Sequence, residues 1–169
     1  MKDMSKRLHG VKYTIFTVVF LVLSPAFLPA QTAAELEAVL ETPAVTCAQA
    51  ARFVTASSGG AASSGGTASA GSDDFQQAME KGWFPQGTTP DESITLGKLS
   101  FLIMRAFDIK GGMMYAILPG PRYAFRTLVS RSFIQGSADP SMTVNGERFL
   151  HILGKVLNAE GEETGGGET

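Results

Sequence analysis

Two stretches of the chain carry the same order of apolar, capping and proline residues fifty positions apart, although few of their letters agree. Residues 75–107 read FQQAMEKGWFPQGTTPDESITLGKLSFLIMRAF, and residues 125–157 read FRTLVSRSFIQGSADPSMTVNGERFLHILGKVL. In both, apolar residues follow the i, i+3, i+4, i+7, i+8 spacing of an amphipathic helix. A loop proline and a good N-cap residue precede that stripe. The match predicts one helix–loop–helix segment written twice.

The paired positions define the predicted segment. The loop prolines are Pro90 and Pro140, and the N-cap residues are Thr95 and Asn145. The second-helix stripes are Leu99, Leu102, Ile103, Ala106, Phe107 and Phe149, Ile152, Leu153, Val156, Leu157. Each first helix is expected to end near an aromatic residue, Trp83 or Phe133. We expect the apolar sides of the two helices in each segment to face each other.

A weaker third copy precedes these two. In VTCAQAARFV, Val45 and Thr46 occupy the places of Ile94 and Thr95. Its first half is shortened to AAELEAVLETPA, with an apolar face of Leu36, Val39 and Leu40. The sequence therefore predicts an all-α fold, in which tandem helix–loop–helix repeats form one small helical domain.

The first thirty residues have the pattern of a secretory signal peptide. Four basic residues precede the apolar run 14–23, and the small residue Ala30 marks a cleavage site before Gln31. An uncleaved membrane anchor is the alternative, but the apolar run is shorter than the roughly 20 residues that a spanning helix needs. We expect export to the periplasm, cell envelope or exterior, with no stable transmembrane segment after cleavage.

The remaining chain divides by composition. Residues 57–72 are almost entirely Ser, Gly and Ala, which favours a flexible linker, and residues 159–169 have the composition of a disordered tail. The predicted order is a signal peptide (1–30), a degenerate first repeat (31–56), the linker (57–72), a repeat (73–110), a connector (111–122), a repeat (123–158) and the tail (159–169). In the connector, residues 113–118 are expected to form a short apolar segment packed over the core.

The segment 78–107 resembles the S-layer homology (SLH) repeat, in which an "[I/V]-T-R-x-E" motif opens the second helix. Here ITLGK stands at that place, and the helix ends in RAF. The resemblance covers about 85 residues together with the degenerate copy at 45–54. It implies a helical envelope module.

The departures from the SLH pattern concern the ligand. SLH modules typically bind an acidic cell-wall polymer through a basic residue that follows the cap threonine. That position is Cys47, Leu96 and Gly146 in the three copies, and Lys98 replaces the acidic residue of the motif in one of them. The resemblance therefore supports a fold and an envelope location, and no binding residue is carried over from it.

Few residues could support catalysis or a metal. Residues 31–169 contain one cysteine, Cys47, and one histidine, His151, so an ordinary zinc site within the chain is excluded. The acidic pairs Asp73-Asp74 and Asp91-Glu92 are interpreted as a helix start and a solvated loop. No cofactor, metal or catalytic residue is predicted. A core position is favoured for Cys47, and an intermolecular disulfide stays open.

Basic residues concentrate in the middle of the chain. Without residues 1–30 the formal charge is −5, yet residues 98–131 contain six basic residues and one acidic residue, Asp108. Six residues of this region are the candidate partner-binding set: Arg105, Lys110, Arg122, Tyr123, Arg126 and Arg131. The simpler interpretation is that these residues form a solvated face that binds no partner. Export disfavours nucleic acid.

These observations favour a non-catalytic envelope module that docks to a cell-wall polymer or another envelope component. A periplasmic protein–protein adaptor that uses residues 113–118 is the alternative, and an enzyme ranks last.

Overall fold

The computed structural model describes residues 29–59 and 68–165; most of the predicted signal peptide, half of the predicted linker and the last four residues lie outside this range. The described residues are mostly helical and include no named strand, which confirms the all-α prediction. The helices are α2 (Pro29–Leu40), α3 (Cys47–Ser57), α4 (Ala68–Glu80), α5 (Leu96–Ala106), α6 (Met113–Ile117), α7 (Pro121–Ser130) and α8 (Gly146–Gly165).

The chain divides into two parts, residues 1–33 and residues 34–169. The buried apolar residues run from Val39 to Val156, so the second part contains the whole described core. No helix among the described residues combines the length and apolar character needed to cross a membrane.

Three buried residues from distant parts of the chain form a closed ring of backbone hydrogen bonds. Val45 donates its N–H to the carbonyl of Val144 at 2.8 Å, and Val144 donates to Ile94 at 3.1 Å. Ile94 in turn donates to Val45 at 2.8 Å, which closes the ring. All three residues are fully buried. Each of the three residues stands directly before one of the paired N-cap positions, so equivalent positions of the three copies meet at one point in the core.

The helices that follow these three residues begin inside the protein, where water cannot satisfy their first N–H groups. Each of these N–H groups finds a carbonyl in another segment of the chain. Cys47 donates to Glu92, Leu96 to Met142, and Gly146 to Thr42, each at 2.9 Å. The next N–H groups, of Ala48 and Gly97, donate to Pro90 at 2.9 Å and to Pro140 at 2.8 Å. The paired loop prolines thus supply equivalent acceptors.

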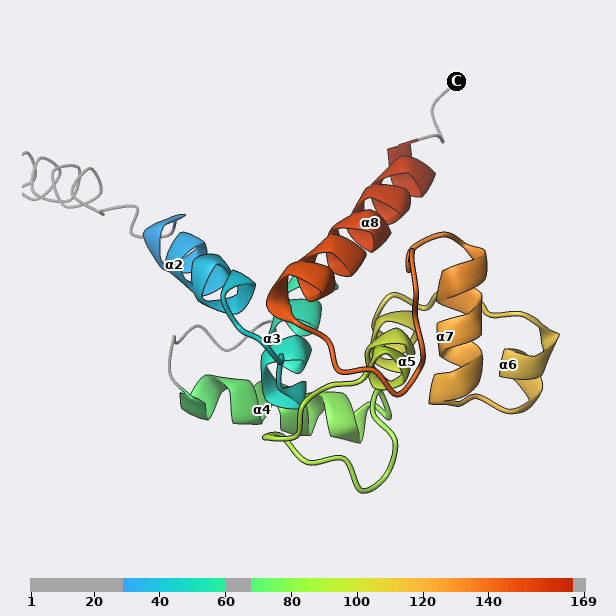
Figure 1. The fold of residues 1–169 in the computed structure, drawn as a ribbon, viewed down its shortest axis with the longest axis horizontal. Coiled ribbons are helices and arrows are strands. Elements are labelled where there is room, and N and C mark those ends of the chain that lie inside the picture. Colours follow the sequence, from blue (N-terminus) through green and yellow to red (C-terminus); the bar gives the residue numbers. More distant parts are fainter. Residues whose placement is uncertain (1–28, 60–67, 166–169) are drawn as a thin grey trace, which may run out of the picture. The chain divides into compact units, whose positions relative to one another are not determined.

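The helices pack between segments and not within them. α4 packs against α3, and α7 packs against α5, while α3 also contacts α5 and α8 (Figure 1). The expectation that the two helices of one segment face each other is therefore wrong. Periodicity identifies the apolar side of a helix, but it does not identify the neighbour that covers that side.

The predicted N-caps are confirmed in all three copies. The side chains of Thr46, Thr95 and Asn145 accept hydrogen bonds from the backbone N–H three residues later. Thr46 also forms a capping box with Gln49. The predicted stripe residues of α5 and α8 are buried or half-buried, except Leu157, which lies at the edge of the core.

Several sequence expectations need correction. α4 begins at Ala68 and α8 continues to Gly165, so helix extends into the predicted linker and tail. The pair Asp73-Asp74 consequently lies in the middle of α4, and Asp74 is buried. Of the predicted apolar face of α2, only Val39 is buried, while Leu36 and Leu40 are exposed.

The connector also differs from its expected position. Residues 113–118 include the helix α6, but four of their six side chains are large apolar groups that face solvent and do not cover the core. They are Met113, Met114, Ile117 and Leu118.

Gly146 allows α2 to approach the start of α8. A Cβ at this position would lie 1.6 Å from the carbonyl oxygen of Val39 and 2.5 Å from its carbonyl carbon. Backbone atoms cannot rotate away as the end of a flexible side chain can. The close contact explains why glycine occupies the first position of α8, where α3 and α5 have cysteine and leucine.

Gly146→Ala is expected to lower the free energy of unfolding by about 1–3 kcal/mol, because the added methyl group must push α2 away from α8. Gly154→Ala in the same helix is the matched control, since a Cβ there meets no atom within 4 Å. That control should raise stability by about 0.5–1 kcal/mol, the usual difference between alanine and glycine in a helix. Urea unfolding of both variants measures the difference, and equal stabilities would contradict the close packing of α2.

Candidate functional site

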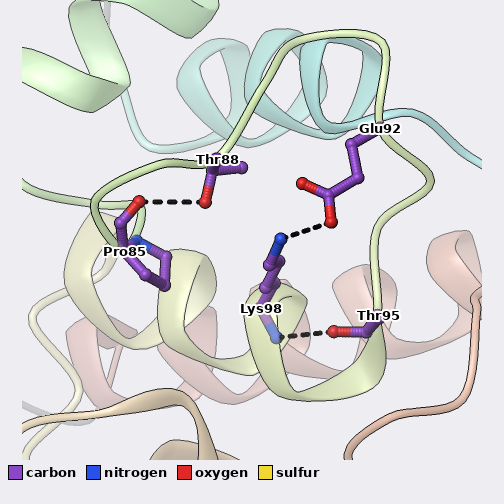
Figure 2. A network of polar contacts seen from close by, with 5 residues as sticks. All are labelled: Pro85, Thr88, Glu92, Thr95 and Lys98. Atoms are coloured by element: carbon purple, nitrogen blue, oxygen red, sulfur yellow. Dashed lines mark hydrogen bonds and ion pairs between the residues drawn. The ribbon is translucent and has the colours of Figure 1, made fainter.

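The start of α5 is occupied by a polar network that ties the preceding loop to the helix. The Lys98 ammonium donates to Glu92 Oε1 at 2.6 Å, and the Thr88 hydroxyl donates to the Pro85 carbonyl at 2.9 Å (Figure 2). The hydrogen bond from Lys98 lowers the pKa of Glu92. The pair therefore stabilises the fold above the ordinary pKa of a glutamate, and this contribution is lost as the pH falls through the lowered pKa. Because both side chains are partly exposed, the pair contributes only about 0.2–1 kcal/mol.

The first residues of the second helices are not available to a ligand. Cys47 and Leu96 are fully buried, and Gly146 is buried against α2. These are the positions at which SLH modules typically carry a basic residue. The charge of Lys98, two residues farther along α5, is already paired with Glu92. Any partner must therefore be recognised elsewhere on the surface.

Four of the six predicted partner-binding residues meet in one groove. The groove has a volume of about 550 Å³ and lies where α6 and the preceding glycines face α7. We call it the basic groove; it is lined by Lys110, Gly111, Gly112, Met113, Met114, Tyr115, Tyr123, Arg126, Thr127, Ser130 and Arg131. It combines three cationic side chains with two tyrosines, and no acidic residue lines it.

The groove is held together by a contact between its two rims. The Arg131 guanidinium donates to the backbone carbonyl of Lys110 at 2.8 Å. This bond leaves the positive charge of Arg131 uncompensated, since its acceptor is neutral. Arg126 and Lys110 are exposed, so three positive charges lie along a single opening.

Arg122 faces a second hollow that adjoins the groove. This hollow has a volume of about 440 Å³ and is lined by Arg122, Phe125, Arg126, Asp139 and Pro140. The hydroxyl and backbone N–H of Ser141 both bond to Asp139 and lower its pKa, so this carboxylate stays charged. Arg122 thus shares a hollow with an acidic residue, whereas no acidic residue lines the basic groove; Arg126 borders both hollows.

Arg105 lines neither hollow. Its guanidinium lies over the Phe101 ring, 5.3 Å from the ring centroid, and its charge acts on Tyr115. Tyr115 packs edge-on against Phe101 at 6.4 Å between centroids. Burial raises the pKa of Tyr115, with Arg105 opposing the shift. Arg105 therefore supports the aromatic contact that attaches α6 to α5, and the structure does not place it with the other predicted residues.

The predicted set omitted residues that the groove contains. Tyr115, Met113 and Met114 come from the connector, which was expected to pack over the core. Gly111 was a signal for this arrangement, because a Cβ at Gly111 would lie 2.5 Å from the Tyr115 ring. The glycine leaves room for Tyr115 to fold back onto the chain that precedes it.

Cys47 lies in the core, and burial raises its pKa from 9.0 to about 11. His151 is exposed on α8. Across residues 29–59 and 68–165, no three His, Cys, Asp or Glu side chains are grouped so as to hold a metal ion. The arrangement that the structure does offer is a cationic, aromatic groove suited to binding an anionic partner.

No protein-family model, curated protein or solved structure matches the chain.

We expect the Cys47 thiol to react with a disulfide reagent at pH 8 roughly 100-fold or more slowly in the folded chain than in the unfolded chain, because access requires opening of the core. The reaction is followed by absorbance with and without urea. Rapid reaction of the folded chain, or a covalent dimer on a non-reducing gel, would contradict the buried position and favour the intermolecular disulfide.

The raised pKa adds a pH dependence. A thiol that resists ionisation in the fold contributes stability below pH 9.0, and this stability is lost as the pH rises toward about 11. Cys47→Ala should flatten the stability profile in that range, measured by urea unfolding at several pH values. A profile unchanged by the substitution would show that the thiol is accessible to solvent.

Proposed function

We propose that the chain is a non-catalytic, exported module of the cell envelope, with SLH-like repeats, that docks through the basic groove onto an anionic envelope component. A cell-wall polymer is the partner that the SLH resemblance implies. The observation that carries the proposal is the groove itself, in which Lys110, Arg126 and Arg131 line one opening without an acidic residue.

Equivalent backbone geometry supports the repeat. Gly82 and Ser132 stand fifty positions apart, and both have positive φ angles, of 68° and 62°. Their N–H groups donate to Met79 and Val129, each at 3.0 Å. The cost of this conformation for Ser132 makes a chance coincidence improbable, because residues other than glycine adopt it uncommonly.

The ring of Val45, Ile94 and Val144 supports the inclusion of the short first copy. Each of the three residues gives one hydrogen bond to the ring and receives one from it. The first segment therefore has the same role in the ring as the other two. This pairing supports our proposal that the first copy belongs with the other two.

The non-catalytic part of the proposal is supported by the positions of the two side chains best suited to catalysis. Burial raises the pKa of the Cys47 thiol, which disfavours the reactive thiolate. His151 lies exposed on α8, outside the basic groove. Export is supported by the sequence of residues 1–30, which lie mostly outside the described part of the chain.

A periplasmic protein–protein adaptor is the second candidate. The observation in its favour is the run of exposed apolar side chains from Met113 to Leu118. Exposed apolar patches of this kind are typical of interaction surfaces. In that case a defined protein would bind α6, and the basic groove would contribute little.

The test is retention of residues 31–169 on a purified acidic envelope polysaccharide. We expect retention that weakens as salt is raised, because screening shortens the reach of exposed charges. Arg126→Ser combined with Arg131→Ser should reduce retention by roughly tenfold or more, in line with removal of two positive charges from the groove.

Lys81→Ser combined with Lys155→Ser is the matched control, since it changes the net charge equally but leaves the groove intact. It should retain most of the binding. If both double variants lose binding to the same degree, net charge alone explains retention and the groove is not a site. Salt-independent capture of one protein by the groove variant would favour the adaptor.

A further inference from the structure

α6 and the residue after it carry apolar side chains that are exposed and do not pack in the core. Met113, Met114, Ile117 and Leu118 are 78%, 55%, 70% and 61% exposed. The other exposed large apolar residues among those described are at most 48% exposed and are distributed over four other parts of the chain. We call these four side chains the α6 tip. Their concentration within six residues is the largest apolar exposure in the described part of the chain.

The α6 tip is held outward by its neighbours in sequence. Gly111 and Gly112 lead into the helix, and Pro119-Gly120-Pro121 leads out of it into α7. Tyr115 is the side chain that faces inward, against Phe101 of α5. Its hydroxyl oxygen is buried. One aromatic anchor thus fixes the helix, while the four apolar side chains stay exposed.

Positive charge lies beside the α6 tip. From Ile109 to Ala138 the chain contains Lys110, Arg122, Arg126 and Arg131 and no acidic residue. Three of these cations share the basic groove with Met113 and Met114, so charge and apolar surface are contiguous. The formal charge of the whole chain is −2, which makes this region an exception within an acidic protein.

We propose that the α6 tip inserts into the surface of a lipid bilayer with anionic headgroups, while the cations of the basic groove bind those headgroups. Apolar side chains next to a cationic groove match the two layers of such a surface, acyl chains beneath phosphates. This proposal rests on the proposed function, since it names the anionic envelope component as lipid.

Two observations favour a lipid surface over the other partners. A soluble polyanion would use the cations but would leave the four apolar side chains in water. A protein partner would cover the tip with apolar surface of its own, but nothing in that contact would require the surrounding cations. The bilayer accounts for both features together, and the charge complementarity needs no particular sequence in the partner.

The test uses residues 31–169, which contain the whole described core, and measures co-sedimentation with two kinds of vesicles. One kind is phosphatidylcholine alone, and the other is an equimolar mixture of phosphatidylcholine and phosphatidylglycerol. We expect binding to the mixed vesicles, release by added salt, and little binding to phosphatidylcholine. Ile117→Ser combined with Leu118→Ser should weaken vesicle binding by roughly tenfold or more, because the buried apolar area is lost.

Leu36→Ser combined with Leu40→Ser is the matched control, because it removes two exposed leucines on α2, outside the α6 tip. It should bind vesicles as the parent chain does. Neither double variant alters a buried core residue, so both should keep the urea unfolding midpoint of the parent chain. Equal binding by the α6 variant and the parent would overturn insertion of the tip.

The same proteins on the acidic polysaccharide separate this proposal from the proposed function. Polysaccharide retention without vesicle binding would overturn the lipid proposal and leave the proposed function standing. Vesicle binding that depends on Ile117 and Leu118, with no polysaccharide retention, would support lipid as the partner and exclude the cell-wall polymer. Capture of a defined protein through the α6 tip, with no vesicle binding, would overturn the proposal in favour of the adaptor. Loss of all three activities would overturn both proposals.

Discussion

The fold depends on satisfying buried helix starts with carbonyls from elsewhere in the chain. A helix that begins in the core leaves N–H groups without water, and each unpaired group would cost about 1–3 kcal/mol. The ring of Val45, Ile94 and Val144, with the bonds that follow it, removes most of that cost for α3, α5 and α8. Since every segment both donates and accepts, removal of one would expose polar groups in the other two.

This interdependence explains why a short, poorly matching first copy is part of the domain. α4 covers α3 and α7 covers α5, so no segment buries its apolar stripe alone. The first segment contributes the capping box of Thr46 and Gln49 and the acceptors for Ile94 and Gly146. The end of α2 lies so close to the start of α8 that only glycine fits at position 146.

The sequence predicted local features, such as N-caps and apolar stripes, better than it predicted which helices pack against each other. The N-caps at Thr95 and Asn145 and the buried stripes follow from spacing, because both depend on residues within two helical turns. The exchange of helices between segments did not follow, because an apolar stripe does not specify its neighbour. The predicted partner-binding residues do not all meet in the structure, for a similar reason. Arg126 and Arg131 share a groove, but Arg105 lies over Phe101 of its own helix, and the count of charges along the sequence does not show which of them line one groove.

The ring of backbone hydrogen bonds joins the three segments without help from the connectors between them. The sequence of a connector can therefore vary. The residues between α5 and α7 contribute no acceptor to the ring, and α6 buries none of its own residues. Changes in this connector therefore cost little stability, which is the usual condition for a loop that carries function. The positions where SLH modules place their basic residue are sealed here by Leu96, Cys47 and the close approach of α2. The exposed apolar side chains of α6 and the cations of the basic groove lie outside these sealed positions.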